Sequence, residues 1–266
     1  MFMNGENFTL ITGASMGIGK AFSKACAERG MNLVLVALPD GQLADVQKEI
    51  LALWKVKVYI FTIDLTEKGA VKQLYAFCMD MKLTINVLIN NAGIGTGGRF
   101  ENIALEKQLK IVDLNNKVLV RMCHYFLPLL QQQEKAYILN MSSMEANLPL
   151  PYKAVYTGSK NFVYAFSLAL REELKRGPVG VSVVCPGPVV TNAEGLERMK
   201  AHGNRANLVV FMPDEVAEIG LKGLLKGKTI IIPGKINWVL VKLSRLFPTA
   251  IKMRLLERLF RVYSSD

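Results

Sequence analysis

Short apolar runs alternate along the chain with longer stretches in which apolar residues recur every three or four positions. The longer stretches, among them 17–28, 41–53 and 105–130, predict helices. The short runs predict seven strands, at Phe8–Thr12, Asn32–Ala37, Lys57–Ile63, Val87–Asn90, Ala136–Met141, Gly180–Cys185 and Lys228–Ile232. The four apolar residues from Leu33 to Val36 are typical of a strand covered on both faces. The alternation therefore predicts an α/β fold, built on a single doubly wound parallel sheet with helices on both faces.

The chain shows no internal repeat and no low-complexity linker, so we expect residues 1–234 to form one domain. Within it, residues 191–212 follow a proline-rich strand end and contain glycine, methionine and many charges. We expect this segment to be a flexible flap over the substrate. Residues 235–266 predict a tail of two amphipathic helices separated near Pro248, which belongs to the same domain or to an interface.

The net charge of +11 is concentrated in that tail. The last 32 residues carry seven Lys or Arg and two acidic residues, a net +5, and the other 234 residues carry +6. A basic excess concentrated in one tail, without an accompanying binding motif, argues against a nucleic-acid-binding protein.

Cysteine and histidine usage argues against a disulfide framework, a zinc site and a His-based catalytic triad. The four cysteines form no C-x-x-C pair, and the chain has two histidines. We expect buried thiols and no metal site. No signal peptide or membrane-spanning segment is visible, which favours a cytoplasmic protein.

A glycine-rich turn follows the first predicted strand and opens the first predicted helix. Its glycines are Gly13, Gly17 and Gly19, and Ser15, Met16 and Ile18 lie between them. Such a turn directs backbone N–H groups and the positive helix terminus at a phosphate, and glycine allows the pyrophosphate to approach closely. We expect all six residues to contact a dinucleotide. An ordinary glycine-rich strand-to-helix turn is the alternative.

The end of the second predicted strand bears on the choice between NAD and NADP. A carboxylate there would bind the ribose 2′-hydroxyl of NAD, whereas a nearby Arg or Lys would bind the 2′-phosphate of NADP. The chain has Ala37 and Leu38 at this point, and Asp40 beyond them is equally suited to cap a helix. Because the carboxylate is missing at Ala37, we favour NADP(H) slightly over NAD(H).

Tyr156 and Lys160 are four residues apart on a predicted helix, so their side chains project from one face. A neighbouring ammonium favours the phenolate, so we expect Lys160 to lower the pKa of Tyr156 toward the range useful for proton transfer. Ser143 lies thirteen residues before the tyrosine and is favoured over Ser142 as the group that holds the substrate oxygen. Tyr152 lacks a cation at the corresponding spacing and is expected to line the pocket.

These motifs together resemble the short-chain dehydrogenase/reductase family over almost the full chain. The matching residues, in order, are Thr12–Gly19, Asp64, Asn90–Gly93, Asn115, Ser143, Tyr156 with Lys160, and Pro186–Thr191. The resemblance implies a Rossmann-like fold and an NAD(P)-dependent oxidoreductase. Family members that use NADP usually carry a basic residue at the position of Met16 or Leu38, and neither is basic here.

The resemblance also implies roles for single residues. Asp64 and Leu65 would flank the adenine ring. The remaining cofactor contacts would come from Asn91, Ala92 and Gly93 in the groove, and from Pro186, Gly187, Val189 and Thr191 toward the nicotinamide and the adjacent phosphate.

For catalysis, the resemblance implies that Asn115 joins Ser143, Tyr156 and Lys160. Asn115 would anchor a water that links Lys160 to solvent, and Lys160 would also bind the ribose hydroxyls of the nicotinamide half. Pro128 is expected to end the long middle helix, as in family members. Asn116 is then expected to be a surface or packing residue.

The predicted pocket is apolar and suits a lipophilic ketone, aldehyde or 3-oxoacyl substrate. Its expected lining is Met144, Leu148, Pro149, Leu150 and Tyr152, with Leu196, Met199, Leu208, Val209 and Phe211 from the flap. Arg198, Lys200 and Arg205 would meet an anionic handle, although a solvated loop is the favoured alternative. The competing function is a catalytically idle protein that keeps the fold for cofactor binding or regulation.

The tail interleaves apolar and basic residues. It can pack its apolar stripe on the domain or on a second subunit, or it can lie in a membrane interface. We favour packing or dimerisation over membrane contact, and expect a homo-oligomer.

Overall fold

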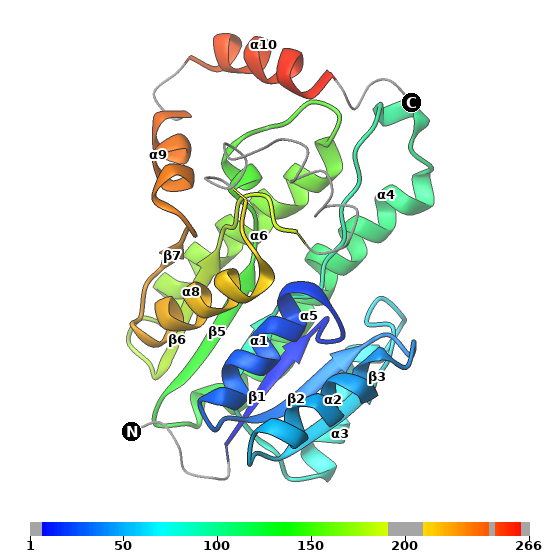
Figure 1. Ribbon diagram of the computed structural model, residues 1–266, viewed down its shortest axis with the longest axis vertical. Coiled ribbons are helices and arrows are strands. Elements are labelled where there is room, and N and C mark those ends of the chain that lie inside the picture. The colour runs from blue at the N-terminus through cyan, green and yellow to red at the C-terminus, as the bar shows by residue number, and fades with distance from the viewer. Residues whose placement is uncertain (1–6, 191–209, 245–247, 262–266) are drawn as a thin grey trace.

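The structure, a computed structural model, describes residues 7–190, 210–244 and 248–261 (Figure 1). Within them, seven strands form one parallel sheet in the order β3-β2-β1-β4-β5-β6-β7. The strands are β1 (Asn7–Thr12), β2 (Asn32–Ala37), β3 (Val58–Thr62), β4 (Thr84–Asn90), β5 (Ala136–Met141), β6 (Val179–Val184) and β7 (Ile230–Ile231). The predicted α/β fold with one doubly wound parallel sheet is confirmed.

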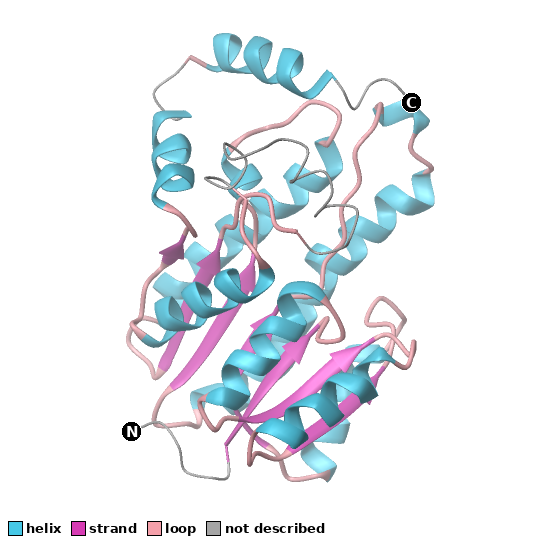
Figure 2. Cartoon of the chain, in the orientation of Figure 1, coloured by secondary structure: helices cyan, strands magenta, loops and turns pink. Residues whose placement is uncertain are grey.

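Helices cover both faces of this sheet (Figure 2). One face carries α1 (Gly17–Glu28), α2 (Gln42–Leu53) and α8 (Pro213–Leu225). The other carries α3 (Ala70–Asp80), α5 (Leu119–Gln131) and α6 (Ala154–Leu174). α4 (Leu105–Val112) precedes α5, and α9 (Lys235–Ser244) and α10 (Thr249–Phe260) form the tail on the outside of the molecule.

Successive residues of β2 are apolar because the strand is covered by helices on both faces. Leu33 and Leu35 belong to the core beneath α1 and α2, whereas Val34 and Val36 belong to the core on the opposite face. All four are fully buried. A central parallel strand is dry on both sides, so neither alternating set can be polar.

The predicted helix over 105–130 is confirmed as a continuous helical stretch, in which a π-helical segment, Asp113–Val118, lies between α4 and α5. The expectation that Pro128 ends this helix is wrong, because α5 continues through it to Gln131. Leu130 is completely buried in the core, and this packing holds the last turn although proline cannot donate its backbone hydrogen bond.

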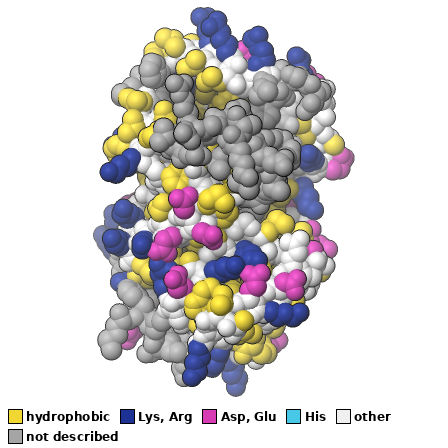
Figure 3. All heavy atoms as spheres, viewed as in Figure 1, with side chains coloured by type: hydrophobic (Ala, Val, Ile, Leu, Met, Phe, Trp, Pro, Cys, Tyr) yellow, Lys and Arg dark blue, Asp and Glu magenta, His cyan; other side chains and the backbone are white. Residues whose placement is uncertain are grey.

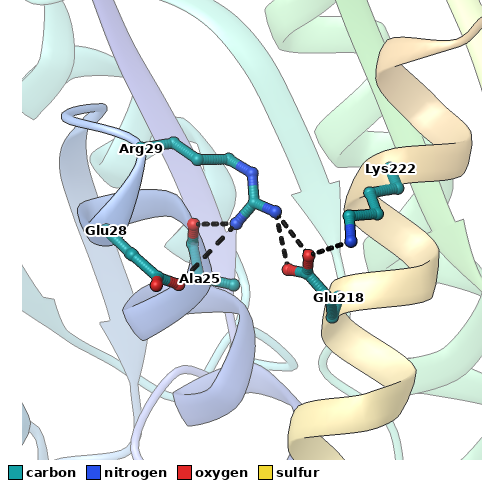
Figure 4. A network of polar contacts seen from close by, with 5 residues as sticks. All are labelled: Ala25, Glu28, Arg29, Glu218 and Lys222. Atoms are coloured by element: carbon teal, nitrogen blue, oxygen red, sulfur yellow. Dashed lines mark hydrogen bonds and ion pairs between the residues drawn. The ribbon is translucent and has the colours of Figure 1, made fainter.

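A polar cluster ties α1 to α8 across the first face (Figure 4). Both oxygens of Glu218 accept hydrogen bonds from Nη2 of Arg29 at 2.7 Å, and Lys222 lies 2.8 Å from the same carboxylate. Arg29 also donates to the carbonyl of Ala25 at 2.8 Å. The hydrogen bonds from Lys222 and Arg29 hold the pKa of Glu218 below its usual value. This cluster fastens α8 to the helix that begins at the glycine turn.

Candidate active site

The glycine turn is held in place by the segment that follows β4. Nδ2 of Asn91 donates to the carbonyls of Thr12 at 2.9 Å and Gly13 at 3.2 Å. The backbone N–H groups of Asn91 and Ala92 both donate to the Thr12 hydroxyl, at 3.1 and 3.0 Å. A Cβ at Gly19 would lie 2.0 Å from the Gly13 carbonyl oxygen, so only glycine fits there. The two ends of neighbouring strands are thus locked together.

The turn presents the N-terminus of α1 without a competing protein anion. Met16 is the N-cap residue and makes no side-chain capping bond, and the first helical turn contains no acidic residue. Gly13 and Gly17 have φ values of +65° and +53°, which favour glycine. An uncapped helix start of this kind suits a phosphate. The residues present therefore fit the pyrophosphate of a dinucleotide.

The residues expected around the adenosine half lie at the neighbouring strand ends. Ala37 is buried, whereas Leu38 and Met16 are about half exposed. Asp40 accepts a hydrogen bond from the backbone N–H of Gln42 at 3.1 Å, so its carboxylate serves the start of α2. The N-cap residue of α2 is Gly41, so Asp40 is not the N-cap itself but bonds to the first residue of the helix.

Asp64 follows β3. Burial raises the pKa of its carboxyl, but hydrogen bonds from the Thr66 hydroxyl and backbone N–H lower the pKa by more. Lys110, 3.5 Å away, adds to them, and the pKa of Asp64 is lowered. Leu65 is buried in the core of the second face.

The π-helical segment positions Asn115. Its Oδ1 accepts from the backbone N–H of Ile94 at 3.0 Å, and its Nδ2 donates to the Ile94 carbonyl and the Ser159 hydroxyl, both at 2.9 Å. Asn115 thereby links the segment after β4 to α6. Asn116 donates to the Ser159 carbonyl at 2.9 Å and is buried, which makes it a packing residue. Short π-helical segments inside α-helices frequently occur at functional sites.

Lys160 is a buried cation with few partners. Its Nζ donates to the Met141 carbonyl at 3.0 Å, and burial lowers its pKa to about 8. A Cβ at Gly93 would lie 3.1 Å from both this nitrogen and Oδ1 of Asn115, so the three residues meet at one point. A small cavity lies beside these residues, and its lining includes Thr12, Asn90, Asn115 and Lys160. It adjoins the two residues that the family resemblance connects through a water.

Tyr156 does not have the pKa that its spacing to Lys160 predicts. Burial, and secondly the charge of Glu145, raise the pKa of Tyr156 to about 12, although a hydrogen bond with Ser143 lowers it. The Lys160 nitrogen lies 5.9 Å from the centre of the tyrosine ring and is directed to the Met141 carbonyl. The expected acidification by Lys160 is therefore wrong for this structure, because desolvation outweighs a cation that has another partner.

The two serines have separate roles. Ser142 donates to the backbone carbonyl of Lys160 at 2.7 Å and fixes α6 to the end of β5. Ser143 begins a short 3₁₀ helix, accepts from the backbone N–H of Glu145 at 3.1 Å and contacts Tyr156. Of the two serines, Ser143 is the one whose side chain meets Tyr156.

A cavity opens beside Tyr156. Its wall includes Thr96, Phe100, Ile103, Tyr152, Val155 and Tyr156. Tyr152 lines it as expected, whereas Leu150 is buried in the core. Phe100 and Ile103 belong to the loop after β4 and carry no motif, so the sequence offered no signal for them. Of the expected flap residues, Phe211 is described and pairs with Val189.

The remaining flap residues, and the expected cofactor contact Thr191, lie outside the described part of the chain. Pro186 lies close to Ser143, because its carbonyl accepts from the N–H of the next residue, Met144, at 2.8 Å. Gly187 and Val189 follow it along the same edge.

A family model described as short chain dehydrogenase matches residues 7–201. The chain belongs to this family. Its motifs at the glycine turn, after β4, at Ser143 and at Tyr156 with Lys160 all fall inside the matched region.

Two curated relatives illustrate the range of this short-chain dehydrogenase family. The probable oxidoreductase EphD of Mycobacterium tuberculosis is 29% identical over 263 residues, which cover 93% of this chain and 44% of that protein. The very-long-chain 3-oxoacyl-CoA reductase of Kluyveromyces lactis is 32% identical over 203 residues, which cover 73% of this chain and 58% of that protein. The chain spans about half the length of these two relatives.

Solved structures share the fold. A 7β-hydroxysteroid dehydrogenase superposes with a TM-score of 0.86 at 23% identity, covering 94% of this chain and 96% of that one. A short-chain dehydrogenase from Burkholderia phymatum in complex with NAD gives 0.81 at 25% identity, with 92% and 95% covered. Another from Sphingobium yanoikuyae in complex with NADPH gives 0.76 at 27% identity, with 90% and 94% covered.

Two further kinds of site, a metal centre and a membrane-spanning helix, were sought among the described residues of this short-chain dehydrogenase. Nowhere among them do three His, Cys, Asp or Glu side chains gather in a way that could hold a metal ion. No helix within the described ranges combines the length and the apolar character needed to cross a bilayer.

The buried charge of Lys160 predicts a measurable cost in stability. Below pH 8 the lysine is protonated in both the folded and unfolded states, so the full desolvation cost is present. Between pH 8 and 10.5 only the folded state loses the proton, and the cost fades. We expect Lys160→Met to raise the melting temperature of the cofactor-free protein at about pH 7 by roughly 3–6 °C, a net gain of about 1–2 kcal/mol.

Thermal unfolding of both proteins across this pH range checks the prediction. The advantage of the methionine variant should shrink as the pH rises toward 10.5. A variant that is less stable at neutral pH would show that the bond to Met141 outweighs the desolvation of the ammonium.

Proposed function

We propose that this protein transfers a hydride between NAD(P)(H) and a carbonyl/alcohol pair on a lipophilic substrate, with Tyr156 as the proton donor. The observation that carries the proposal is the convergence of Gly93, Asn115 and Lys160 at one point. Ser143 and Tyr156 are in contact beside the same groove. The uncapped start of α1, fixed by Asn91, provides the phosphate end of that groove.

The chain's own residues would hold the dinucleotide along the carboxyl edge of the sheet. The N-terminal N–H groups of α1, with Gly13 and the run Ser15–Gly19, would bind the pyrophosphate. The other expected contacts are Ala37, Leu38, Asp64, Leu65, Asn91, Ala92, Gly93, Pro186, Gly187, Val189 and Thr191. Lys160 and Tyr156 would bind the ribose of the nicotinamide half. When bound, the nicotinamide supplies or accepts the hydride.

Tyr156 is suited to giving a proton to the substrate oxygen. Its raised pKa keeps the phenol protonated near neutral pH, which is the form that a reduction requires. An alkoxide is a much stronger base than a phenolate, so transfer from Tyr156 to the oxygen is downhill once hydride has reached the carbon. Ser143, in contact with Tyr156, would hold the substrate oxygen by a hydrogen bond.

Lys160 and Asn115 would support this step. Lys160 would bind the ribose hydroxyls of the nicotinamide half, and its pKa of about 8 keeps it mostly protonated at neutral pH. Asn115 holds the loop after β4 through both backbone groups of Ile94. The cavity between Asn115 and Lys160 provides the place for the water that would connect the lysine to solvent.

For the cofactor we propose NADP(H) over NAD(H). Ala37 offers no carboxylate to a ribose 2′-hydroxyl, and Asp40 is engaged at the start of α2. For the substrate we propose a ketone, aldehyde or 3-oxoacyl compound with an apolar body. The wall of the cavity beside Tyr156 is largely apolar, with Phe100, Ile103 and Val155. The relative from Kluyveromyces lactis is named a 3-oxoacyl-CoA reductase.

Replacement of the phenol tests the proton-transfer role. We expect Tyr156→Phe to lower the turnover of a reactive ketone by about 10²–10⁴-fold, because the ring remains while its proton is lost. The dissociation constant of the dinucleotide should change little. Tyr125→Phe, a half-buried tyrosine on α5 away from the cavity, is the matched control and should keep full turnover. Wild-type protein that reduces nothing in a broad carbonyl panel would favour the idle cofactor-binding alternative.

The packing of the tyrosine ring gives a second test. A Cβ at Gly95 would lie 2.8 Å from Cδ2 of Tyr156, whereas a Cβ at Gly158 on the same catalytic helix would meet nothing within 4 Å. We expect Gly95→Ala to displace the ring and to lower kcat by about tenfold or more. Gly158→Ala should keep kcat and add about 0.5–1 kcal/mol of stability. Equal kcat values for the two variants would contradict the proposed position of Tyr156.

The cofactor choice is tested by thermal stabilisation. A ligand at 100 times its dissociation constant adds about 2.7 kcal/mol to the free energy of unfolding. At equal concentrations, NADPH should raise the melting temperature more than NADH. Gly19→Ala should abolish both shifts, because its Cβ would lie 2.0 Å from the Gly13 carbonyl oxygen. A larger shift with NADH would overturn the preference and leave the oxidoreductase proposal standing.

A further inference from the structure

The helix α10 exposes a row of apolar side chains, whereas an amphipathic helix packed on a protein core buries its apolar side chains. Its outward ridge is apolar: Ile251, Leu255 and Leu259 are 57%, 59% and 63% exposed. Leu256, on the inward side, is buried. A helix that only covers a domain would bury its apolar stripe and expose its charges. Here an apolar stripe faces solvent.

The preceding helix extends this apolar surface. In α9, Asn237 and Val241 are buried against the domain, whereas Trp238, Leu240 and Leu243 are 44–48% exposed. Ile236 and Val239, also on α9, are exposed to a similar degree. We call the outward side chains of α9 and α10 the tail face, which comprises Ile236, Trp238, Val239, Leu240, Leu243, Ile251, Leu255 and Leu259. In Figure 3 hydrophobic and basic side chains lie side by side along the margin occupied by these two helices.

The charge around the tail face has one sign. The described tail residues carry Lys235, Lys242, Lys252, Arg254, Arg258 and Arg261 against the single acid Glu257. Glu257 is itself engaged, because it accepts hydrogen bonds from Arg261 and from the Tyr152 hydroxyl. The Lys242 ammonium lies 4.6 Å from the Trp238 ring centre, so its chain runs along the aromatic surface while its charge stays in water.

We propose that the tail face docks on a membrane surface that contains anionic lipids. Apolar side chains that enter the acyl boundary, with lysine and arginine beside them at the level of the headgroups, are the features of an interfacial helix. A second copy of the chain is disfavoured as the occupant. In a twofold dimer formed through the tail face, the lysines and arginines of one copy would lie against those of the other and repel them.

The tail face lies next to the cavity of the proposed active site. The Tyr152 hydroxyl donates to Glu257 on α10 at 3.1 Å, and Lys153 lies 5.7 Å from the ring centre of Phe260. Tyr152 and Lys153 also line the cavity beside Tyr156. Docking would therefore bring the cavity close to the lipid, where an apolar substrate is concentrated. That consequence rests on the proposed function, whereas the docking itself does not.

Vesicle flotation of the full chain tests the proposal without any measurement of turnover. We expect binding to vesicles of phosphatidylcholine with phosphatidylserine, weaker binding to phosphatidylcholine alone, and a loss of binding as salt is raised. Replacing both Arg254 and Arg258 by Gln should weaken binding about thirtyfold, since each basic residue contributes about 1 kcal/mol near such a surface. Leu255→Ser with Leu259→Ser should weaken it at least about tenfold.

Matched controls separate the tail face from general surface effects. Leu51→Ser with Leu53→Ser removes two exposed leucines of α2, and Lys68→Gln with Lys72→Gln removes two exposed lysines near α3. Both control pairs should bind vesicles as the wild type does. Tyr156→Phe should also bind normally, so a failure of the proposed catalysis leaves this test intact.

Three results would overturn the proposal. The full chain would fail to bind acidic vesicles, or the tail variants would bind as well as the control pairs. The third is a dimer in sedimentation velocity that Leu255→Ser with Leu259→Ser dissociates, which would show that a second copy covers the face. The tail variants and the two control pairs lie at exposed positions, and circular dichroism verifies that every variant folds.

Discussion

The site depends on the contact between the ends of β1 and β4. These strands are neighbours in the sheet although β2 and β3 separate them in the chain, and the connections from them leave toward opposite faces. A crevice opens where the strand order reverses, and ligands of open α/β sheets bind at that place. Asn91 and Ala92 close its floor by binding Thr12 and Gly13. The glycine turn and the segment that follows β4 are thereby held against each other.

Three neighbouring elements converge on this floor. The π-helical segment turns Asn115 toward Ile94, α6 supplies Lys160 and Tyr156, and the end of β5 supplies Ser143. The polar groups brought together in this way are buried, and burial raises the pKa of Tyr156 and lowers that of Lys160. Each shift disfavours the charged form: the lowered pKa of Lys160 costs folding free energy near neutral pH, where the lysine is charged, whereas the raised pKa of Tyr156 costs it only above about pH 10, where the unfolded phenol ionises. Such a cost is typical of sites in which proton transfer is to occur away from bulk water.

In the tail, the unfavourable contribution to stability comes from apolar side chains exposed to water on α9 and α10. Monomeric proteins rarely leave large apolar patches in water unless the patch has a partner. The one acid described in the tail is used to hold α10 to Tyr152, a residue whose φ of +64° is itself unusual for a side chain with a Cβ. The helix is therefore fixed beside the cavity while its apolar ridge stays outward.

The elements that depend on local pattern could be predicted from the amino-acid sequence. The boundaries of β2, β5 and α1 agree with the predicted ones, because apolar runs and glycine turns act over a few residues. The two faces of β2 were also predictable, since only a doubly covered strand is apolar at every position. Tyr156, Lys160 and Ser143 were found by spacing, which a helix and a strand end convert directly into proximity.

The features that depend on partners distant in the chain could not be predicted before the fold was known. The π-helical turn at Asp113–Val118 was not predicted, and Asn115 within it bonds to Ile94 and Ser159, which are distant in the chain. The direction of the Tyr156 pKa was mispredicted because spacing says nothing about desolvation or about the carbonyl of Met141 that attracts Lys160. The outward direction of the apolar ridge on α10 likewise became visible only with the domain in place. Periodicity shows that a helix has two faces, and packing decides which of them is buried.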